Sequence, residues 1–185
     1  MMPEISLNIL DVAQNSITAG ATLIEISVIA LKSEDTLTVV IEDNGCGMNE
    51  EQVKRVTDPF YTTRKTRKVG LGIPFFKLAA ESTGGSFVIE STLGKGTRVE
   101  AVFGLSHIDR MPLGDINSTI HTLIHYNTGI DFLYKYQVDE RGFELDTREF
   151  KKILGDVELD SYEVSEYIKE YLSENKTEVD NGLLI

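Results

Sequence analysis

The residues best suited to chemistry lie in a short glycine-rich stretch, residues 43–48, which reads Asp-Asn-Gly-Cys-Gly-Met. Apolar and polar residues alternate just before it, which predicts a strand over residues 37–42 that delivers Asp43 past the end of a sheet. A carboxylate there is a fixed hydrogen-bond acceptor, while Gly45 and Gly47 would let the backbone approach a flat ligand and adopt positive φ. Because Asn-Gly is also the commonest short hairpin turn, this stretch alone fits either a ligand loop or a plain turn.

A second set of polar residues lies near the N-terminus. The spacing of apolar residues predicts a helix over residues 5–19 that ends at Gly20. Its apolar stripe consists of Leu7, Leu10, Ala13 and Ile17. Asn8, Asp11 and Asn15 recur every three or four residues, which brings their side chains together on the opposite face. A solvated helix face has a similar pattern. Asn and Asp are poor helix-interior residues, however, so their stacking on one face indicates a functional role.

A strongly basic segment forms the third candidate. Four cations occur within five residues, at Arg64, Lys65, Arg67 and Lys68. A glycine pair at positions 70 and 72 then opens a helix that we expect to continue to residue 84. A helix that begins on glycines offers free N–H groups and the positive end of its dipole, both of which suit a phosphate. A solvated surface would explain the cations alone, but their place between two glycine motifs is where a polyanion would need them.

Composition limits the class of protein. Of the 185 residues, 41% are hydrophobic and 26% are charged, which is typical of a soluble globular protein. The net charge of −12 is uneven, because residues 1–104 carry 10 basic and 13 acidic side chains whereas residues 105–185 carry 8 and 17. The acidic residues of the second part would repel a phosphate backbone, so nucleic acid is not an expected partner. One cysteine and no long apolar run predict a cytoplasmic protein without a disulfide or a membrane span.

The order of the predicted elements gives the fold class. Helix, hairpin, helix, loop, helix and hairpin follow one another through residues 1–104, which predicts a two-layer α/β sandwich with a mixed, mostly antiparallel sheet and helices on one face. Residues 105–185 predict a small acidic α+β extension. It would contain a helix over 115–126, a hairpin over 130–145, a short helix from 146 and a longer helix over 161–175. We therefore expect two domains, residues 1–104 and residues 105–185.

Five separated segments together resemble one known pattern. In chain order they are residues 11–22 around Asn15, residues 43–48, residues 58–63, residues 70–72 and residues 94–97. Their order and spacing are similar to the motifs of the GHKL superfamily, which holds the ATPase domains of gyrase, heat-shock chaperones and mismatch-repair proteins and the catalytic domains of histidine kinases and anti-sigma serine kinases. The segment Asp-Pro-Phe-Tyr-Thr-Thr at 58–63 resembles the phenylalanine box of the histidine-kinase branch. The resemblance implies a Bergerat-type ATP-binding fold over residues 5–104, with ATP and Mg²⁺ as ligands.

The resemblance also implies a role for each site residue. Asp43 would accept a hydrogen bond from the adenine amino group, assisted by Thr97, while Gly45 and Gly47 would let their loop pass against the base. Asn15 would hold Mg²⁺ through its side-chain oxygen. Contacts to the phosphates would come from the backbone of a helix start and from a short basic lid. The helix start is Gly70, Leu71 and Gly72, and the lid is Arg64, Lys65 and Lys68.

Asp11 occupies the place where the superfamily puts a catalytic base, usually Glu in the ATPases and often His or Glu in the kinases. Because aspartate is one methylene shorter, it would reach an attacking water or hydroxyl less well, so binding is a firmer expectation than hydrolysis. Thr18 stands where the gyrase and mismatch-repair branches usually place an acid, which favours the kinase side. The predicted function is a trans-acting protein kinase or ATPase in signal transduction. The alternatives are a nucleotide-gated protein-binding switch without turnover and a mismatch-repair-like ATPase.

Residues 105–185 carry no nucleotide motif, and we expect them to form the docking surface for a protein partner or substrate. The length and the C-terminal pattern resemble stand-alone ATP-binding proteins found near iron-only hydrogenases, which makes a hydrogenase-associated system one candidate. Oligomeric state does not follow from the sequence.

Three further features of the sequence are expected to be structural rather than functional. His121 and His125 are four apart on a predicted helix, but no third ligand with suitable spacing accompanies them, so a metal site is not expected. The stripe that includes Tyr167 and Tyr171 is expected to pack in the core. Cys46 is expected to be a small buried filler rather than an oxidant sensor.

Overall fold

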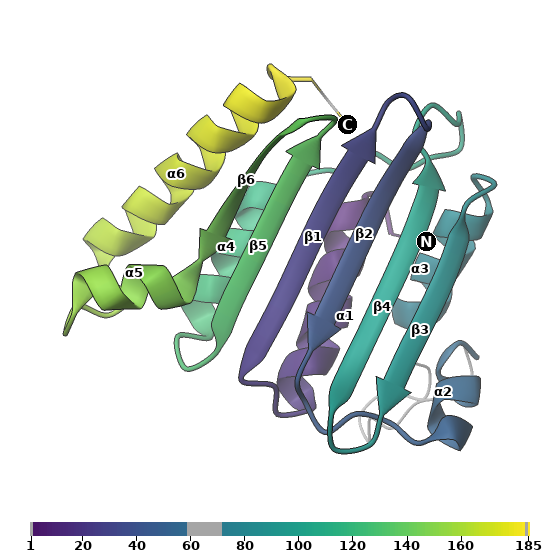
Figure 1. The fold of residues 1–185 in the computed structure, drawn as a ribbon, viewed down its shortest axis with the longest axis horizontal. Coiled ribbons are helices and arrows are strands. Elements are labelled where there is room, and N and C mark those ends of the chain that lie inside the picture. Colours follow the sequence, from purple (N-terminus) through teal and green to yellow (C-terminus); the bar gives the residue numbers. More distant parts are fainter. Residues whose placement is uncertain (1, 59–71, 184) are drawn as a thin grey trace.

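The chain forms one mixed sheet with helices packed against it. The structure is a computed structural model that describes residues 2–58, 72–183 and 185. Its strands are β1 (Leu23–Leu31), β2 (Thr36–Asp43), β3 (Ser86–Thr92), β4 (Gly96–Gly104), β5 (Asp131–Val138) and β6 (Arg141–Asp146). Its helices are α1 (Ile5–Thr18), α2 (Glu50–Val56), α3 (Gly72–Glu81), α4 (Ile116–Tyr126), α5 (Thr147–Leu154) and α6 (Tyr162–Asp180). The six strands lie in the order β3-β4-β2-β1-β5-β6 (Figure 1).

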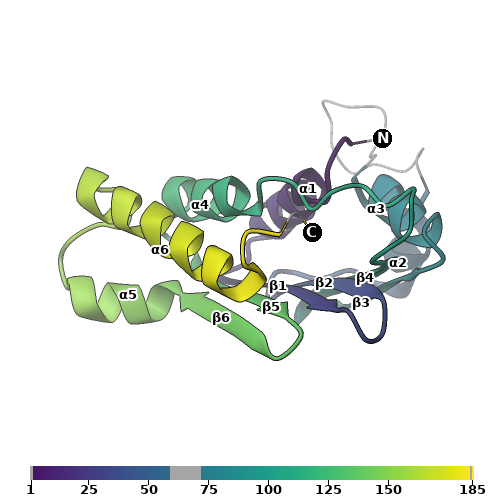
Figure 2. The same ribbon diagram turned by 90° about the horizontal axis from the view of Figure 1, so that it is seen from above.

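Strict alternation in the central strands gives the sheet one buried face. In β1 the buried residues are every second one, and β2 repeats this pattern up to its end. Helices α1, α3 and α4 lie over the buried face, and α6 follows the β6 edge on the same side (Figures 1 and 2). This arrangement confirms the predicted α/β class, with a mostly antiparallel sheet and helices on one face. In the part of the chain that the structure describes, no helix is long and apolar enough to cross a membrane.

The second part of the chain extends the sheet of the first. Strand β5 pairs with β1 in parallel, with Ile26 opposite Tyr134, and β6 then pairs with β5 in antiparallel fashion. A parallel neighbour needs a crossover connection, and α4 supplies it between β4 and β5. The division into residues 1–104 and 105–185 remains a prediction, but the two parts share one continuous sheet.

Helix α1 buries a different stripe from the one predicted. Its fully buried apolar residues are Ile5, Ile9, Val12 and Ala13. Leu10 and Ile17 only pack against the margin of the core. Helix α1 contacts α3 and α4 as well as the sheet, so more than one side of it is enclosed. This enclosure also buries Asn8 completely, although the sequence placed it on a polar face.

Helix α6 is anchored to the sheet by a buried polar cluster. The hydroxyl of Tyr136 on β5 donates to Oδ2 of Asp180 at 2.9 Å, and Lys176 donates to the same oxygen at 2.6 Å. The N–H of Gly182 donates to Oδ1 at 2.8 Å. Burial raises the pKa of Tyr136, and the hydrogen bond to Asp180 raises it further, so the hydroxyl remains a donor. The helix runs to Asp180, five residues beyond the predicted end, because this cluster holds its last turn.

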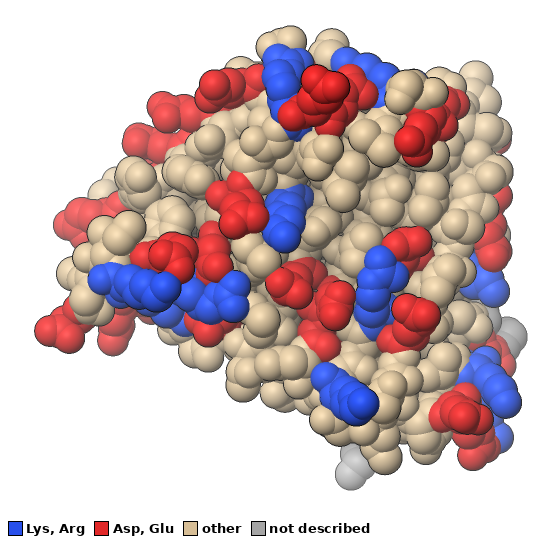
Figure 3. Space-filling model, viewed as in Figure 1, with Lys and Arg blue, Asp and Glu red and all other residues tan. Residues whose placement is uncertain are grey.

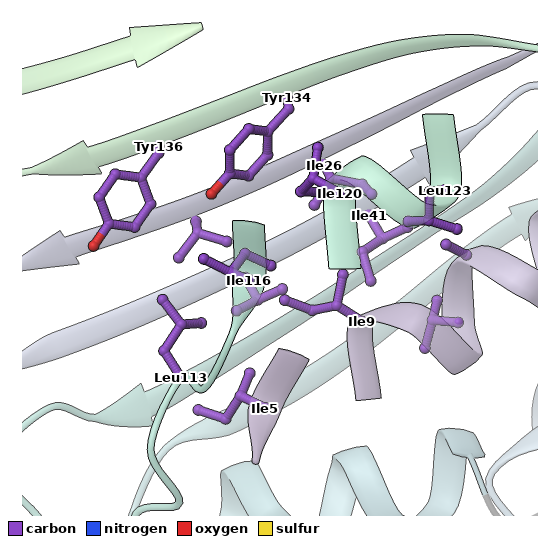
Figure 4. Close-up of a cluster of buried hydrophobic side chains, with 14 of the residues drawn as sticks. Ile5, Ile9, Ile26, Ile41, Leu113, Ile116, Ile120, Leu123, Tyr134 and Tyr136 are labelled. Atoms are coloured by element: carbon purple, nitrogen blue, oxygen red, sulfur yellow. The ribbon is translucent and has the colours of Figure 1, made fainter. Parts of the chain in front are cut away.

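Two tyrosines on β5, two residues apart, differ in the hydrogen bonding of their hydroxyls. Tyr134 and Tyr136 project from β5 into the same layer as Ile116 and Ile120 (Figure 4). Both rings are buried, but the hydroxyl of Tyr134 has no hydrogen-bond partner among the described residues. The pair therefore separates the contribution of the hydrogen bond from that of the ring.

Replacing Tyr136 with Phe should lower the free energy of unfolding by about 1–3 kcal/mol, because it removes a donor from a buried carboxylate. Tyr134→Phe is the matched control and should change it by less than about 0.5 kcal/mol or raise it, since an unpaired hydroxyl is removed. Urea unfolding of the two variants and the wild type measures both values. Equal losses in the two variants would show that the Asp180 contact does not anchor α6.

Candidate functional site

Asp43, the last residue of β2, has both carboxylate oxygens fixed by hydrogen bonds. The hydroxyl of Ser16 on α1 donates to Oδ2 at 2.5 Å, and the N–H of Gly45 donates to Oδ1 at 2.8 Å. Ser16 is buried, while Asp43 remains partly accessible. Each carboxylate oxygen has a further lone pair, so the side chain is oriented and still able to accept a hydrogen bond from a ligand.

Thr97 lies directly opposite Asp43, because β2 and β4 pair in antiparallel register. Its hydroxyl is 2.8 Å from that of Ser91 on β3. Ser91 donates to the carbonyl of Gly96 at 2.9 Å and accepts the N–H of Met48 at 2.8 Å. With the hydrogen of Ser91 already used, Thr97 must donate to Ser91, and its own oxygen remains an acceptor. The structure thus brings the two predicted residues together as neighbouring acceptors.

The glycines around Asp43 are required by the loop itself. Gly47 has φ of +65° and Gly96 has φ of +129°, values that favour glycine. A Cβ at Gly47 would overlap the carbonyl of Thr92, and one at Gly96 would overlap the carbonyl of Asp43. A Cβ at Gly45 would come within 3.0 Å of the Asp43 carboxylate. Close backbone packing, rather than a simple hairpin turn, therefore explains the glycine spacing.

Cys46 is exposed, so the expectation that it is a buried filler was wrong. The backbone rather than the side chain of this residue holds the loop. Its N–H donates to the carbonyl of Ala19 at 2.9 Å, and its carbonyl accepts the N–H of Gly94 at 2.7 Å. These two bonds connect the loop to the end of α1 and to the turn between β3 and β4. The side chain, which is free of both tasks, points to solvent.

A second part of the site forms where α1 meets the start of α3. The Asp11 carboxylate packs so closely against Gly72 that a Cβ at residue 72 would overlap it. The negative charge lies at the N-terminal end of α3, where the helix dipole favours it. Asn15 lies one turn further along α1, at a half-buried position. Helix α1 thus carries Asp11 at one end of the site and Ser16, which holds Asp43, about 7.5 Å further along its axis.

Five of the predicted site residues lie outside the described residues. They are Arg64, Lys65, Lys68, Gly70 and Leu71. Their roles as lid and phosphate cradle stay predictions. Gly72, the last residue of the predicted cradle, is described as the first residue of α3.

The sequence reading missed the residues that orient the site. Ser16 follows Asn15 directly, and a small polar residue in a helix interior was the signal that could have identified it. Asn44 accepts the N–H groups of Thr22 and Leu23 at 2.8 and 3.0 Å, which fastens the loop to the start of β1. Ser91 gave no signal in the sequence, because an exposed strand edge commonly carries serine.

Comparison with protein families shows to which family the chain belongs. The family model described as histidine kinase-, DNA gyrase B- and HSP90-like ATPase matches residues 3–107, more than half of the chain. The chain belongs to this ATPase family. The match covers both parts of the site, Asp43 with its glycines and Asp11 with Gly72, and confirms the superfamily resemblance of the motifs.

The relatives of this ATPase-family chain include a putative sensor protein and a kinase. A putative sensor protein of Shewanella frigidimarina is 36% identical over 103 residues, which is 55% of this chain and 16% of that protein. Sporulation kinase E of Bacillus subtilis is 34% identical over 96 residues, 52% of this chain and 13% of that protein. The chain therefore spans less than a fifth of the length of these relatives. The crystal structure of the N-terminal domain of a DNA repair protein is a distant likeness, with a TM-score of 0.49 and 16% identity over 78% of this chain and 52% of that one.

The two ends of the site suit different chemical groups of one ligand. At one end, a fixed carboxylate and a hydroxyl oxygen offer acceptors beside closely packed glycines, which suits a flat donor-bearing ring. At the other, a helix start, an amide and a carboxylate suit an anion accompanied by a hard cation. The residues present therefore fit a purine nucleotide with a divalent metal.

Gly47→Ala should lower the free energy of unfolding by about 1–3 kcal/mol more than Gly94→Ala does. Both glycines have positive φ, so both variants carry a backbone cost of about 1–2 kcal/mol. Only at Gly47 does the new Cβ meet a backbone carbonyl, because nothing lies within 4 Å of a Cβ at Gly94. Urea unfolding of the two variants gives the difference. Equal destabilisation would contradict the close packing of the loop on β3.

Proposed function

We propose that the chain binds ATP with Mg²⁺ and acts on a partner protein as a trans-acting kinase or ATPase. The observation that carries the proposal is the Asp43 carboxylate, which Ser16 and Gly45 hold at the end of β2 opposite Thr97. A preset acceptor loses little freedom on binding, so an amino donor on a ring gains most of the hydrogen-bond energy. Guanine presents a carbonyl where adenine presents its amino group, and a carboxylate would repel it.

The other end of the site supports binding of the phosphates. Asn15 provides an amide oxygen, the kind of hard ligand that Mg²⁺ accepts alongside phosphate oxygens and water. Gly72 begins α3, whose N-terminus attracts phosphate. The basic residues Arg64, Lys65 and Lys68 follow the same logic as a lid, on the evidence of the sequence alone.

Asp11 is the residue that would act as the catalytic base of this site. Bound ATP would supply the γ-phosphoryl group, and ADP would be the leaving group. Asp11 would accept the proton of the attacking water, or of a hydroxyl or imidazole of the partner, as the new phosphorus bond forms. Its position against Gly72 supports this role, because the start of α3 is where the phosphates are proposed to lie. The name of one relative, sporulation kinase E, supports phosphoryl transfer as the activity.

We propose a cytoplasmic site of action. The chain has one cysteine, and its side chain is exposed. An exposed thiol without a disulfide partner in the chain fits a reducing compartment.

Asp43→Asn should weaken ATP binding about 10–100-fold, equivalent to about 1.4–2.8 kcal/mol, because an amide nitrogen can face the adenine amino group where an acceptor stood. Glu34→Gln, an equal charge change at an exposed turn, is the control and should leave the affinity unchanged. Isothermal calorimetry with Mg²⁺ measures all three proteins. Unchanged affinity for Asp43→Asn would end the adenine assignment, and no binding by wild type would end the proposed function.

Asp11→Asn should lower the rate of phosphate release or transfer by about 10²–10⁴-fold and leave ATP affinity within about threefold. The amide keeps the size of the side chain but cannot accept the proton. The assays are release of inorganic phosphate and transfer of labelled phosphate to candidate partners. A wild type that binds ATP but never exceeds background would instead support the switch without turnover, and an equal rate in both proteins would remove Asp11 from the mechanism.

A further inference from the structure

A cavity of about 460 Å³ opens between α4 and α6, in the part of the chain without nucleotide motifs. The two helices pack against each other, and the second half of α4 and the first half of α6 supply its walls. Its lining combines two histidines, two tyrosines, a serine and both signs of charge. Neither the ATPase-family site nor the core explains this set of side chains.

The floor of the cavity is polar, and its side chains are paired with one another. Nε2 of His121 lies 2.8 Å from Oγ of Ser165, and Nδ1 of His125 lies 3.4 Å from the same oxygen. Burial lowers the pKa of His121, and nearby Lys169 and His125 lower it further, so this ring is neutral at neutral pH. Among residues 2–58, 72–183 and 185, no group of three His, Cys, Asp or Glu side chains could hold a metal ion. The floor therefore closes the cavity with polar side chains that already have partners.

The rim is aromatic and acidic. Tyr126 is 77% exposed and Tyr162 is 76% exposed, although both line the cavity. Glu166 is paired with Lys169 at 2.7 Å, so these two charges offset each other. Asp160 is exposed at the rim and forms no ion pair in the described part of the chain. The uncompensated charge of the cavity is thus negative, beside two accessible aromatic rings.

The surroundings strengthen this charge. Between residues 155 and 168 the chain has five acidic residues and no Lys or Arg. They are Asp156, Glu158, Asp160, Glu163 and Glu166. Acidic side chains also gather along the edge formed by α6 (Figure 3). A partner that approaches this edge needs a positive surface.

We infer that this cavity is a docking site for an arginine side chain on a basic segment of the partner protein. A guanidinium can stack on a tyrosine ring and pair with a carboxylate through two parallel hydrogen bonds, which matches Tyr126, Tyr162 and Asp160. Its aliphatic stem carries no charge and can lie against the paired side chains of the floor. The inference rests on the proposed function for its biological meaning, since it names the chemistry of the protein acted upon, but the docking itself needs no nucleotide.

The test is a ¹H–¹⁵N NMR titration of the full chain, without nucleotide, using a blocked tetra-arginine peptide as the probe. Shifts should concentrate at residues around the cavity. Asp160→Asn and the double variant Tyr126→Ala/Tyr162→Ala should each weaken binding at least fivefold. These side chains are exposed, so the variants should keep the wild-type spectrum elsewhere. Tetra-lysine should bind more weakly than tetra-arginine, because ammonium groups stack poorly.

Glu174→Gln is the matched control, since it removes the same charge from the exposed side of α6, away from the cavity lining. It should change the affinity by less than twofold. Equal weakening by Glu174→Gln and Asp160→Asn, or shifts spread over all acidic surfaces, would show non-specific attraction and overturn the inference. Shifts at the cavity with inorganic phosphate or a tetra-glutamate peptide, in place of tetra-arginine, would also overturn it. Because nucleotide is absent, none of these outcomes depends on ATP binding or turnover.

Discussion

The hydrogen bond from Ser16 to Asp43 connects the two layers of the molecule at the site. It joins the interior of α1 to the last residue of β2, and the N–H of Gly45 fixes the other carboxylate oxygen. A partly buried carboxylate is costly unless its oxygens are bonded, so the loop must adopt the conformation that supplies these donors. The glycines at residues 45, 47 and 96 are consequences of that conformation.

Helix α1 gives the site its length. Asp11, Asn15 and Ser16 belong to one rigid helix, and Ser16 holds Asp43. The proposed catalytic base, Asp11, therefore keeps a fixed distance from Asp43, which is proposed to bind the adenine ring. The sheet and two further helices enclose this helix, which explains why Asn8 is buried in it. A change in the packing of α1 would therefore displace both ends of the site together.

Much of the fold followed from local patterns, and the roles expected of the site residues came from the resemblance of the motifs to a known family. The alternation predicted over residues 37–42 is present in β2. The stripe predicted for α1 is not, because a helix with neighbours on several sides has no single apolar face. Tyr167 was expected in the core but is 56% exposed, and its ring contacts the rings of Phe150 and Tyr171. Parallel pairing of β5 with β1 has no signature in either strand.

The account depends most on the claim that Asp43 accepts a hydrogen bond from the 6-amino group of adenine. The most direct measurement compares the affinities of ATP and purine riboside triphosphate, which lacks only that group, for the wild type and for Asp43→Ala. In the wild type the analogue should bind about 10–100-fold more weakly, since a charged acceptor loses its donor. In Asp43→Ala the two nucleotides should bind equally. Equal affinities in the wild type, or the same preference for ATP in both proteins, would contradict the account.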